Sequence, residues 1–411
     1  MAFTFLRAGR FFAALVILLA ALPSAAAPSI NGLWDAIVIP GKAEIPFRFE
    51  IRQSGNQVMG YFFEGDRKVG STAGRFENGT LKLEYDFLNT VLEATLDGDQ
   101  LHGTYRNKRA NARPMEFRAR RFASPPAVQA KAPQVNGNWE MFRTAQDNSR
   151  LAVSWRLYLR QSGSEVSGAI LKTSGDTGTL TGHWKDGMLT MSHFAGERPL
   201  LFEARMNPDG TLNITLDRQF TYRAARTTEA RAKGIPEPPD PTRFTSVKDP
   251  TEPFHFSGLD LAGKTVSDKD AQFQGKVVIL AVGGTWCPNC HDEAPFLVEL
   301  YKKFKSRGLE IVGLNVEFEE ELDDARPRIA AFIKRYGIQF PMLVPGTPDD
   351  ASRKLSQLVN MSVYPTTIFL GRDGRVRAVH AGFASVATGA EHIRLKNEET
   401  AFIQQLLAEK L

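Results

Sequence analysis

Two stretches of the chain alternate strictly between apolar and polar residues. Residues 47–52 read Phe-Arg-Phe-Glu-Ile-Arg, and residues 155–160 read Trp-Arg-Leu-Tyr-Leu-Arg. Because successive side chains of a strand point to opposite faces, this period of two predicts β-strands with one buried face. Turn sequences such as Asp97-Gly98 and Asp209-Gly210 punctuate both regions and predict about eight short antiparallel strands in each.

The two β regions share short sequences in the same order. Ile-Asn-Gly-Leu-Trp at 30–34 returns as Val-Asn-Gly-Asn-Trp at 135–139, and Arg-Gln-Ser-Gly occurs at 52–55 and again at 160–163. These matches predict two copies of one fold, over residues 28–122 and 135–228. Each copy is expected to be an antiparallel up-and-down barrel or a curled sandwich.

A Gly-x-Trp on the first strand of each copy, with arginines on the last strand, resembles the calycin and lipocalin pattern. The glycines and tryptophans are Gly32 and Trp34, and Gly137 and Trp139; the arginines are Arg118 and Arg120, and Arg223 and Arg226. The resemblance implies that the tryptophan closes the barrel floor and that an arginine packs across it. Barrels of this size either hold a small ligand or are filled by their own side chains. We favour the filled form and assign no ligand.

After residue 253 the pattern changes to buried strands that alternate with amphipathic helices. The apolar run Val277–Val282 predicts a central strand covered on both faces. Further strands are predicted at 310–316 and 340–344, helices up to about 306, over 324–336 and over 349–359, a hairpin of 366–370 and 376–381, and a C-terminal helix near 399–409. Residues 253–411 are therefore expected to form a mixed sheet with helices on both faces.

Proline-rich stretches separate the predicted domains. One covers residues 122–133 and the other covers 229–252. Segments of this composition are extended, semi-rigid spacers. We therefore expect the C-terminal domain to be held away from the two β domains.

The first residues of the chain have the pattern of a secretory signal peptide. Arg7 and Arg10 precede an uncharged run over 11–22, and small residues follow at 24–27. We predict cleavage near Ala26, so that residues 1–26 are removed and the mature protein is periplasmic or otherwise extracytoplasmic. The alternative is an uncleaved anchor, although the run is shorter than the ~20 residues that a spanning helix needs.

Composition and charge narrow the class of protein. Hydrophobic residues make up 42% of the chain and charged residues 24%, as in ordinary globular proteins. The net charge of +5 is spread along the chain without the basic clusters that phosphate binding requires, so no nucleic-acid partner is expected. The chain has 2 cysteines, Cys287 and Cys290. Because a bridge across so short a loop would stabilise the fold by only about 2 kcal/mol, the pair is better explained as redox chemistry.

Both cysteines lie in Gly-Thr-Trp-Cys-Pro-Asn-Cys-His at 284–291, directly after the predicted central strand. Cys-x-x-Cys at this place indicates a redox dithiol, whereas Cys-x-x-Cys-His is also the attachment sequence of c-type haem. In the haem interpretation His291 would be the axial ligand. The preceding strand and the downstream Pro-Thr-Thr favour the dithiol, and His291 is then expected at the surface, where it would tune the thiolate.

Two other chemistries are disfavoured by the same motif. Two cysteines and an adjacent histidine cannot easily surround a tetrahedral zinc ion. A peroxidase would carry proline and threonine flanks around a single reactive cysteine, and these flanks are absent. No metal is therefore expected.

The roles of the two thiols follow from their places on the helix. A dithiol enzyme needs one accessible thiolate and a second thiol that releases the mixed disulfide. Free backbone N–H groups and the helix dipole would stabilise Cys287 as an exposed thiolate, and Cys290, one turn on, would be less exposed and would resolve. Glu293 lies on the same helical face, where it could take a proton from Cys290 through one water. The alternative is a solvated first-turn glutamate.

Residues 253–411 resemble the thioredoxin fold and, within it, the exported thiol:disulfide oxidoreductases of the TlpA and ResA type. The resemblance rests on residues 275–280, Trp286–Cys290, Glu293–Pro295 and Tyr364–Leu370, with a helix–strand insertion between 324 and 346. It implies that the carboxylate at 293 moves the proton. The buried aspartate of thioredoxin is replaced here by Ala281, which leaves Glu293 and Asp292 as the nearby carboxylates.

The surroundings of the dithiol are expected to bind substrate. The fold needs a sharp turn at Tyr364-Pro365, so a cis peptide is predicted there, with a backbone free to pair with a substrate strand. Trp286 would be an apolar contact beside the thiols. Pro295 is predicted inside a continuing helix, because the apolar stripe resumes at Leu297.

The sequence therefore predicts a multidomain chain with two β-barrel repeats and an α/β thioredoxin-like domain. Its predicted function is that of an exported thiol:disulfide oxidoreductase, with Cys287, Cys290 and Glu293 catalytic and Trp286, Tyr364 and Pro365 binding substrate. The redox-active disulfide would replace any cofactor. Expected partners are exported cysteine-containing proteins and a membrane thiol electron donor; the resemblance favours reduction. The alternative is a ligand- or partner-binding β protein whose dithiol senses redox state.

Overall fold

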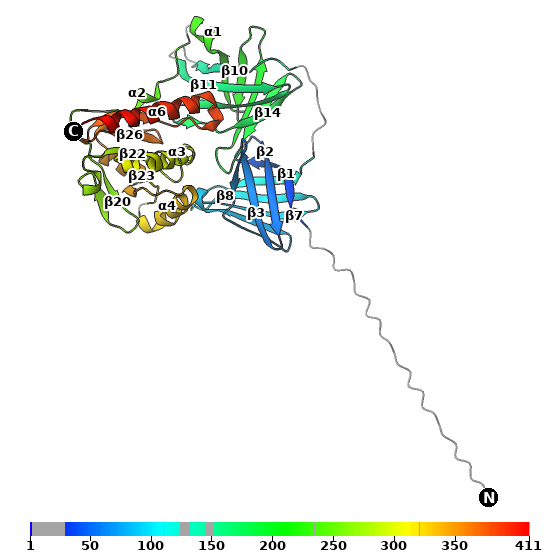
Figure 1. The fold of residues 1–411 in the computed structure, drawn as a ribbon. Coiled ribbons are helices and arrows are strands. Elements are labelled where there is room, and N and C mark those ends of the chain that lie inside the picture. Colours follow the sequence, from blue (N-terminus) through cyan, green and yellow to red (C-terminus); the bar gives the residue numbers. More distant parts are fainter. Residues whose placement is uncertain are drawn as a thin grey trace.

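The fold was analysed in a computed structural model, which describes residue 1 and residues 29–410 except 110, 124–131, 145–150, 234 and 320. The predicted signal peptide and most of the first proline-rich stretch lie outside these residues. No helix in the described part of the chain is long and apolar enough to cross a membrane. Figure 1 shows two β domains and one α/β domain that lie against one another.

The first β domain is a closed antiparallel barrel of eight strands. In chain order these are β1 (Gly32–Ile39), β2 (Ile45–Ser54), β3 (Gln57–Glu64), β5 (Ala73–Glu77), β6 (Thr80–Tyr85), β7 (Thr90–Asp97), β8 (Gln100–Asn107) and β9 (Met115–Arg121). Each strand pairs with the next, and β9 returns to β1. A short strand β4 (Arg67–Gly70) pairs with β3, and a 3-10 helix η1 (Asp86–Leu88) precedes β7.

The second β domain repeats this topology. Its barrel consists of β10 (Gly137–Thr144), β11 (Leu151–Ser162), β12 (Glu165–Lys172), β14 (Leu180–Lys185), β15 (Met188–His193), β16 (Leu200–Met206), β17 (Leu212–Leu216) and β18 (Phe220–Arg226), and β18 pairs with β10. The short strand β13 (Gly175–Asp176) pairs with the end of β12. Of the two architectures expected from the sequence, the up-and-down barrel is the correct one.

In each barrel an arginine of the last strand lies over the tryptophan of the first. The guanidinium of Arg121 is 4.2 Å from the centre of the Trp34 ring, and that of Arg226 is 4.2 Å from the centre of the Trp139 ring. The prediction of Arg118 or Arg120 for the first barrel is wrong. Arg121 is the register partner of Trp34, as Arg226 is of Trp139, and so these two pairs are adjacent in the ladder.

The first barrel is filled by aromatic side chains, and one of them comes from the second barrel. Phe49, Phe62 and Phe117 are fully buried inside it. Phe194, from the loop that follows β15, packs among them, with its ring centre 5.2 Å from that of Phe62. The hydroxyl of Tyr105 in the first barrel donates to the Gly196 carbonyl of the same loop over 2.7 Å. The 194–199 loop therefore joins the two barrels through a shared core.

The C-terminal domain is built on a mixed sheet of seven strands. Its order is β21 (Thr265–Ser267), β20 (Ser257–Leu259), β24 (Met342–Gly346), β23 (Leu309–Val316), β22 (Val277–Gly283), β26 (Thr366–Leu370) and β27 (Val376–Ala381). Strands β22, β23 and β24 are parallel, and β26 and β27 are antiparallel to their neighbours. The main helices are α3 (Pro288–Phe304), α4 (Leu322–Tyr336), α5 (Pro348–Lys354) and α6 (Ala390–Ala408).

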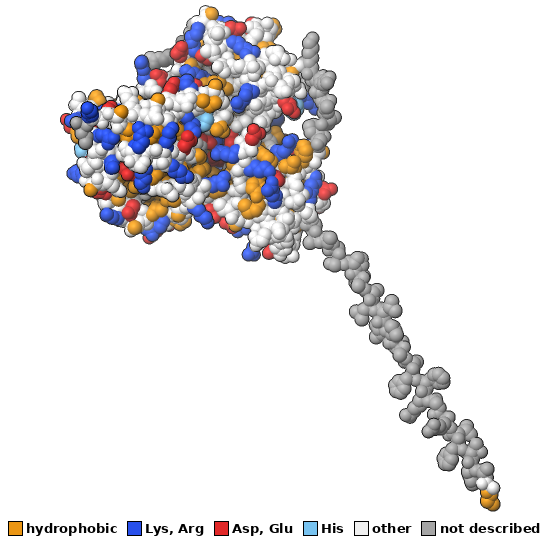
Figure 2. Space-filling model, viewed as in Figure 1, with side chains coloured by type: hydrophobic (Ala, Val, Ile, Leu, Met, Phe, Trp, Pro, Cys, Tyr) orange, Lys and Arg blue, Asp and Glu red, His pale blue; other side chains and the backbone are white. Residues whose placement is uncertain are grey.

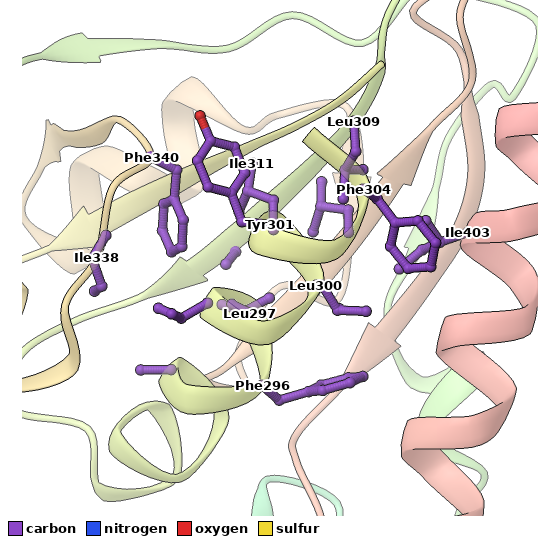
Figure 3. Packing of buried hydrophobic residues seen from close by; sticks show 14 of the residues in the cluster. Phe296, Leu297, Leu300, Tyr301, Phe304, Leu309, Ile311, Ile338, Phe340 and Ile403 are labelled. Carbon is purple, nitrogen blue, oxygen red and sulfur yellow. The ribbon is translucent and has the colours of Figure 1, made fainter. Parts of the chain in front are cut away.

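Helices cover both faces of this sheet, as the apolar run over 277–282 predicted. Val277 and Ile279 belong to the core formed with α3, α4 and α6, whereas Val278 and Leu280 belong to the core that includes α5. Figure 3 shows the first of these cores, where large side chains of α3 meet residues of β23 and of α6. This packing fixes the direction of α3 relative to the end of β22.

Two helices differ from their predicted bounds. Helix α5 ends at Lys354, because residues 358–359 form β25 (Leu358–Val359), which pairs with β19 (Ser246–Val247). Helix α6 begins at Ala390, nine residues before the predicted start at Glu399. The other strands and helices predicted after residue 253 lie within about three residues of their expected ends.

The C-terminal domain is not held away from the barrels, so that expectation is wrong. The second proline-rich stretch folds onto the C-terminal domain through β19 and the short helix α2 (Pro241–Phe244), after a further helix α1 (Thr227–Ala232). The Arg335 guanidinium of α4 lies 4.8 Å from the centre of the Phe87 ring of the first barrel, and Arg160 of the second barrel donates to the Ala387 carbonyl over 3.1 Å. Figure 2 shows basic and acidic side chains interspersed over one face of this assembly.

Candidate active site

Cys287 and Cys290 are joined by a disulfide at the start of α3. Cys287 is the extended N-cap residue, and the helix begins at Pro288. Proline suits this first position because its missing N–H would have had no partner inside the helix. The Cys290 N–H donates to the Cys287 sulfur over 3.2 Å. The helix continues past Pro295 to Phe304, as the apolar stripe predicted.

Strand β22 ends with a glycine that allows Cys290 to lie close to the backbone. A β-carbon at Gly283 would be 2.8 Å from the Cys290 sulfur. Contacts of that length do not occur between carbon and sulfur without displacement of one of them. The absence of a side chain at 283 is therefore part of how the strand end accommodates the disulfide.

Both sulfurs are covered, which contradicts two expectations. Cys287 is 3% exposed and Cys290 is 7% exposed, so Cys287 does not face water and Cys290 is not the less exposed of the two. Cys290 packs against the end of β22, and the second barrel lies beside the start of α3. The side-chain amide of Asn289, between the cysteines, donates to the Ser174 carbonyl over 2.7 Å.

A polar cluster at the start of α3 joins all three domains. Arg198 of the 194–199 loop donates to Asn289 and to the Asp292 carboxylate, in each case over 2.9 Å. Asp176 of β13 accepts from the Ser385 hydroxyl over 3.0 Å, and burial raises the pKa of Asp176 to about 6. Arg67 of the first barrel lies 3.4 Å from Asp292. The start of α3 is thus held by side chains from both barrels.

Glu293 is buried under the sheet side of α3. It is 4% exposed, and its carboxylate accepts from the Thr367 hydroxyl over 2.5 Å. Burial raises the pKa of Glu293 to about 7. The solvated glutamate considered as the alternative is therefore wrong. Thr367 is the register partner of Ala281, so the Glu293 carboxyl lies close to the part of the sheet where thioredoxin carries its aspartate.

A second buried carboxyl near Glu293 was missed in the sequence. Glu399 of α6 is 8% exposed, and burial together with the charge of Glu293 raises its pKa well above its usual range. A signal was available, because Glu399 is four residues from both Leu395 and Ile403 on the buried stripe of α6. A glutamate on an apolar stripe indicates a buried acid.

The predicted substrate-binding residues lie together beside the dithiol. The Tyr364-Pro365 peptide bond is cis, as predicted. The Trp286 ring centre is 5.3 Å from that of Tyr364 and 4.8 Å from that of Phe318, and the indole N–H donates to the Val316 carbonyl over 2.7 Å. The Pro365 carbonyl accepts from the Gly382 N–H over 2.7 Å.

His291 is buried, and the expectation of a surface residue is wrong. One ring nitrogen lies 2.9 Å from the Thr285 carbonyl oxygen and the other lies 2.8 Å from the Tyr336 hydroxyl. Burial lowers the pKa of His291 to about 4, so the ring is neutral near pH 7. With both nitrogens engaged, the histidine fits a structural role better than that of a haem ligand. The described residues contain no group of three or more histidine, cysteine, aspartate or glutamate side chains that could hold a metal ion.

Comparison with known proteins places the C-terminal domain in a family. The model of the AhpC/TSA family matches residues 248–379. The thiol-disulfide oxidoreductase ResA of Bacillus anthracis is 34% identical over 122 residues, which are 30% of this chain and 63% of the relative. ResA of Bacillus subtilis (strain 168) is 32% identical over 137 residues, which are 33% of this chain and 69% of the relative. The chain belongs to the ResA-like thiol-disulfide oxidoreductase family.

The AhpC/TSA match lies within the C-terminal domain, and this chain spans 63% of the length of the Bacillus anthracis relative. A solved thiol:disulfide interchange protein of the thioredoxin family from Chlorobium tepidum TLS is 27% identical and is covered completely by 40% of this chain, with a TM-score of 0.31. The family match over 248–379 and the ResA relatives make the C-terminal domain thioredoxin-like. The two barrels lie outside the matched residues 248–379.

Proposed function

We propose that this protein is an exported thiol:disulfide oxidoreductase that exchanges the Cys287–Cys290 pair with cysteines of other exported proteins. The observation that carries the proposal is the disulfide between these residues at the N-terminal end of α3, next to the cis peptide at Pro365. Thiolates at such a helix end are stabilised by free N–H groups and by the helix dipole.

The reaction follows from the geometry of the pair. In the reduced protein the Cys287 thiolate attacks a substrate disulfide and forms a mixed disulfide, and one substrate sulfur leaves as a thiol. Cys290 then loses its proton and attacks the Cys287 sulfur, which releases the second substrate thiol. Glu293, with its pKa near 7, accepts that proton.

Substrate is positioned by the residues beside the pair. Trp286 and Tyr364 form an aromatic contact surface, and the Tyr364 carbonyl and N–H, beside the cis peptide, pair with an extended substrate segment. The uncharged run over 11–22 supports export and an extracytoplasmic place of work. A reducing direction, with electrons from a membrane thiol donor, is part of this proposal and is what the resemblance to the exported TlpA and ResA-type proteins implies.

The full chain tests this proposal in an insulin-reduction assay in which excess dithiothreitol is the reductant that regenerates the dithiol. We expect catalysis by the wild type, loss of it in Cys287→Ser, and none above the reagent background in the double serine variant. A wild-type rate equal to that of the double serine variant would overturn the proposal.

The burial of both sulfurs favours a second candidate, in which the dithiol is a redox sensor within a binding protein. A sensor would switch between two states without turnover. The two candidates differ in the insulin assay, because a sensor reacts at most once for each protein molecule supplied.

A further inference from the structure

A cavity of about 400 Å³ lies between the first barrel and the C-terminal domain. Its wall in the C-terminal domain includes Trp286 and Pro288, which are the two neighbours of Cys287. Its wall in the first barrel includes Thr90 and Tyr105. The volume is at the low end of the roughly 300–1,000 Å³ that small-molecule sites occupy and is too small for a folded domain.

The opposite side of the start of α3 is occupied. There Asn289 is bonded to Ser174 and to Arg198 of the second barrel. A β-carbon at Gly175 would collide with both the Asn289 side chain and the Phe383 carbonyl, so the loop is closely packed. The second barrel thus covers the Asn289 side of the helix start, whereas Trp286 and Pro288 line the cavity.

The cavity is lined by four arginines: Arg106, Arg109 and Arg113 from the first barrel, and Arg328 from α4. Glu197 is the acidic residue among its lining side chains, and burial raises the pKa of Glu197 to about 7. At neutral pH this carboxyl is therefore charged in only about half of the molecules. The lining carries a clear excess of positive charge.

The arginines are incompletely paired by the protein itself. Arg328 lies 3.2 Å from Glu317 and donates to both carboxylate oxygens of Glu319, one of them over 2.6 Å, and Arg109 is 3.7 Å from Glu319. Even so, the Nε donors of Arg109 and Arg328 are buried and have no hydrogen-bond partner among the described residues. Buried donors without acceptors are costly, and an anion in the cavity would satisfy them.

The other two arginines, Arg106 and Arg113, have weaker ion pairs with the protein. Arg106 meets Glu93 only at 3.9 Å. No acidic group of the described residues lies within 4 Å of the Arg113 guanidinium. Both guanidinium groups are therefore available to a carboxylate on a ligand.

We propose that this cavity binds and selects small disulfides whose substituents carry carboxylates. The inference rests on the proposed function and adds a class of small-molecule substrate to the protein substrates proposed above. The reduced Cys287 thiolate attacks one sulfur of the ligand, the ligand S–S bond breaks, and one half leaves as a carboxylate-bearing thiol after it takes a proton. Cys290 then attacks Cys287, the second half leaves, and two electrons have passed from the protein to the ligand.

Three small disulfides with unbranched arms test the selectivity. They are 3,3′-dithiodipropionate, 2-hydroxyethyl disulfide and cystamine, whose ends are anionic, neutral and cationic. For each compound, the rate at which it oxidises the reduced full chain is divided by the rate at which it oxidises free dithiothreitol. This ratio removes differences in the intrinsic reactivity of the three disulfides. We expect the normalised rate to be roughly tenfold higher for the anionic than for the neutral compound, and lowest for the cationic one. Added salt lowers the preference.

Variants locate the preference in the cavity. Arg113→Gln, alone and combined with Arg106→Gln, lowers the anionic-to-neutral rate ratio toward one. Arg75→Gln is the matched control, because Arg75 is an exposed arginine of the same barrel on β5 that does not line the cavity. Arg113 is an exposed loop residue, so the single variant should fold like the wild type. The test therefore does not depend on whether the double variant folds.

The outcomes separate this inference from the proposed function. If the wild type reduces neither the neutral nor the anionic disulfide, the proposed function is wrong. The inference is then wrong as well. If the neutral compound is reduced but the ratio is near one, or is unchanged by the arginine variants, the proposed function stands and the cavity is not the selective site.

Discussion

The Arg198 guanidinium donates to the Asn289 side-chain oxygen over 2.9 Å, so a residue of the second barrel contacts one of the two residues between the cysteines. The same nitrogen contacts Asp292, and Asn289 also bonds Ser174. The second barrel is therefore part of the immediate surroundings of the dithiol. This contact lies at the same helix end as the two buried cysteines.

Arg198→Gln should make the reduced Cys287 more reactive toward small alkylating reagents. The substitution removes the charge-assisted bonds to Asn289 and Asp292, which hold the second barrel against the start of α3. Loss of bonds of this kind costs about 1–3 kcal/mol, so openings that expose the sulfur become roughly tenfold more frequent. The rate of iodoacetamide labelling, followed by mass spectrometry, measures this change.

The matched control is Arg205→Gln on β16 of the same barrel, where the side chain contacts only the Gly187 carbonyl at 3.4 Å. Its labelling rate should equal that of the wild type. An Arg198 variant that is labelled no faster than the control would show that the barrel does not limit access to Cys287.

Glu293→Gln should remove the pH dependence of the step in which Cys290 attacks the mixed disulfide on Cys287. Because burial raises the pKa of Glu293 to about 7, release of the mixed disulfide in the wild type should accelerate as pH rises through about 7. The variant cannot accept the proton, and we expect it to be about 100-fold slower at pH 8, without that inflection. Stopped-flow measurement of thiol release between pH 5 and 9 tests this, and a variant with the wild-type profile would exclude the role of Glu293.

The same carboxyl should make stability depend on pH in a defined direction. The folded-state pKa lies above the ordinary value of 4.5, so the folded protein holds this proton more tightly than the unfolded chain. Its contribution is full below about pH 4.5 and is lost as pH rises through about 7. Urea unfolding of the oxidised proteins measures this effect. Between pH 5 and pH 8 the free energy of unfolding of Glu293→Gln should rise by up to about 3 kcal/mol relative to that of the wild type. If the difference in free energy of unfolding between variant and wild type were the same at pH 5 and pH 8, the burial of a titrating carboxyl would be contradicted.

Gly283→Ala should destabilise the protein, whereas Gly41→Ala should not. The added methyl at 283 would lie 2.8 Å from the Cys290 sulfur, while a β-carbon at 41 meets nothing within 4 Å. Overpacking of this kind costs about 1–3 kcal/mol. Urea unfolding of the oxidised proteins gives the comparison, and equal stabilities of the two variants would show that the strand end has room for the methyl.

The local pattern of the sequence was sufficient for most of the C-terminal domain. The apolar run over 277–282 and the hairpin turn at 372–374 are short-range signals, and the strands they predict are present. The repeated Trp of the first strands likewise indicated two copies of one barrel. These features depend on residues close together in the chain, where period and turn chemistry decide the structure.

The surroundings of the dithiol could not be predicted, because they come from residues far apart in the sequence. Nothing in the pattern around Arg198 indicates that it meets Asn289, which is 91 positions later. The proline-rich composition of 229–252 suggested a spacer, yet β19 in that stretch pairs with β25 of the C-terminal domain. Burial of His291 likewise depends on distant residues, Phe332 and Tyr336 of α4 and Phe87 of the first barrel, and tertiary contacts of this kind override local propensity.

Trapping the mixed disulfide tests the central claim most directly. Reduced Cys290→Ser, incubated with 2-hydroxyethyl disulfide, should gain one hydroxyethylthio group, and peptide mapping should place it on Cys287. Reduced Cys287→Ser should gain it far more slowly. A group that forms at equal rates on either remaining cysteine, or on neither, would contradict the assignment of Cys287 as the attacking thiol.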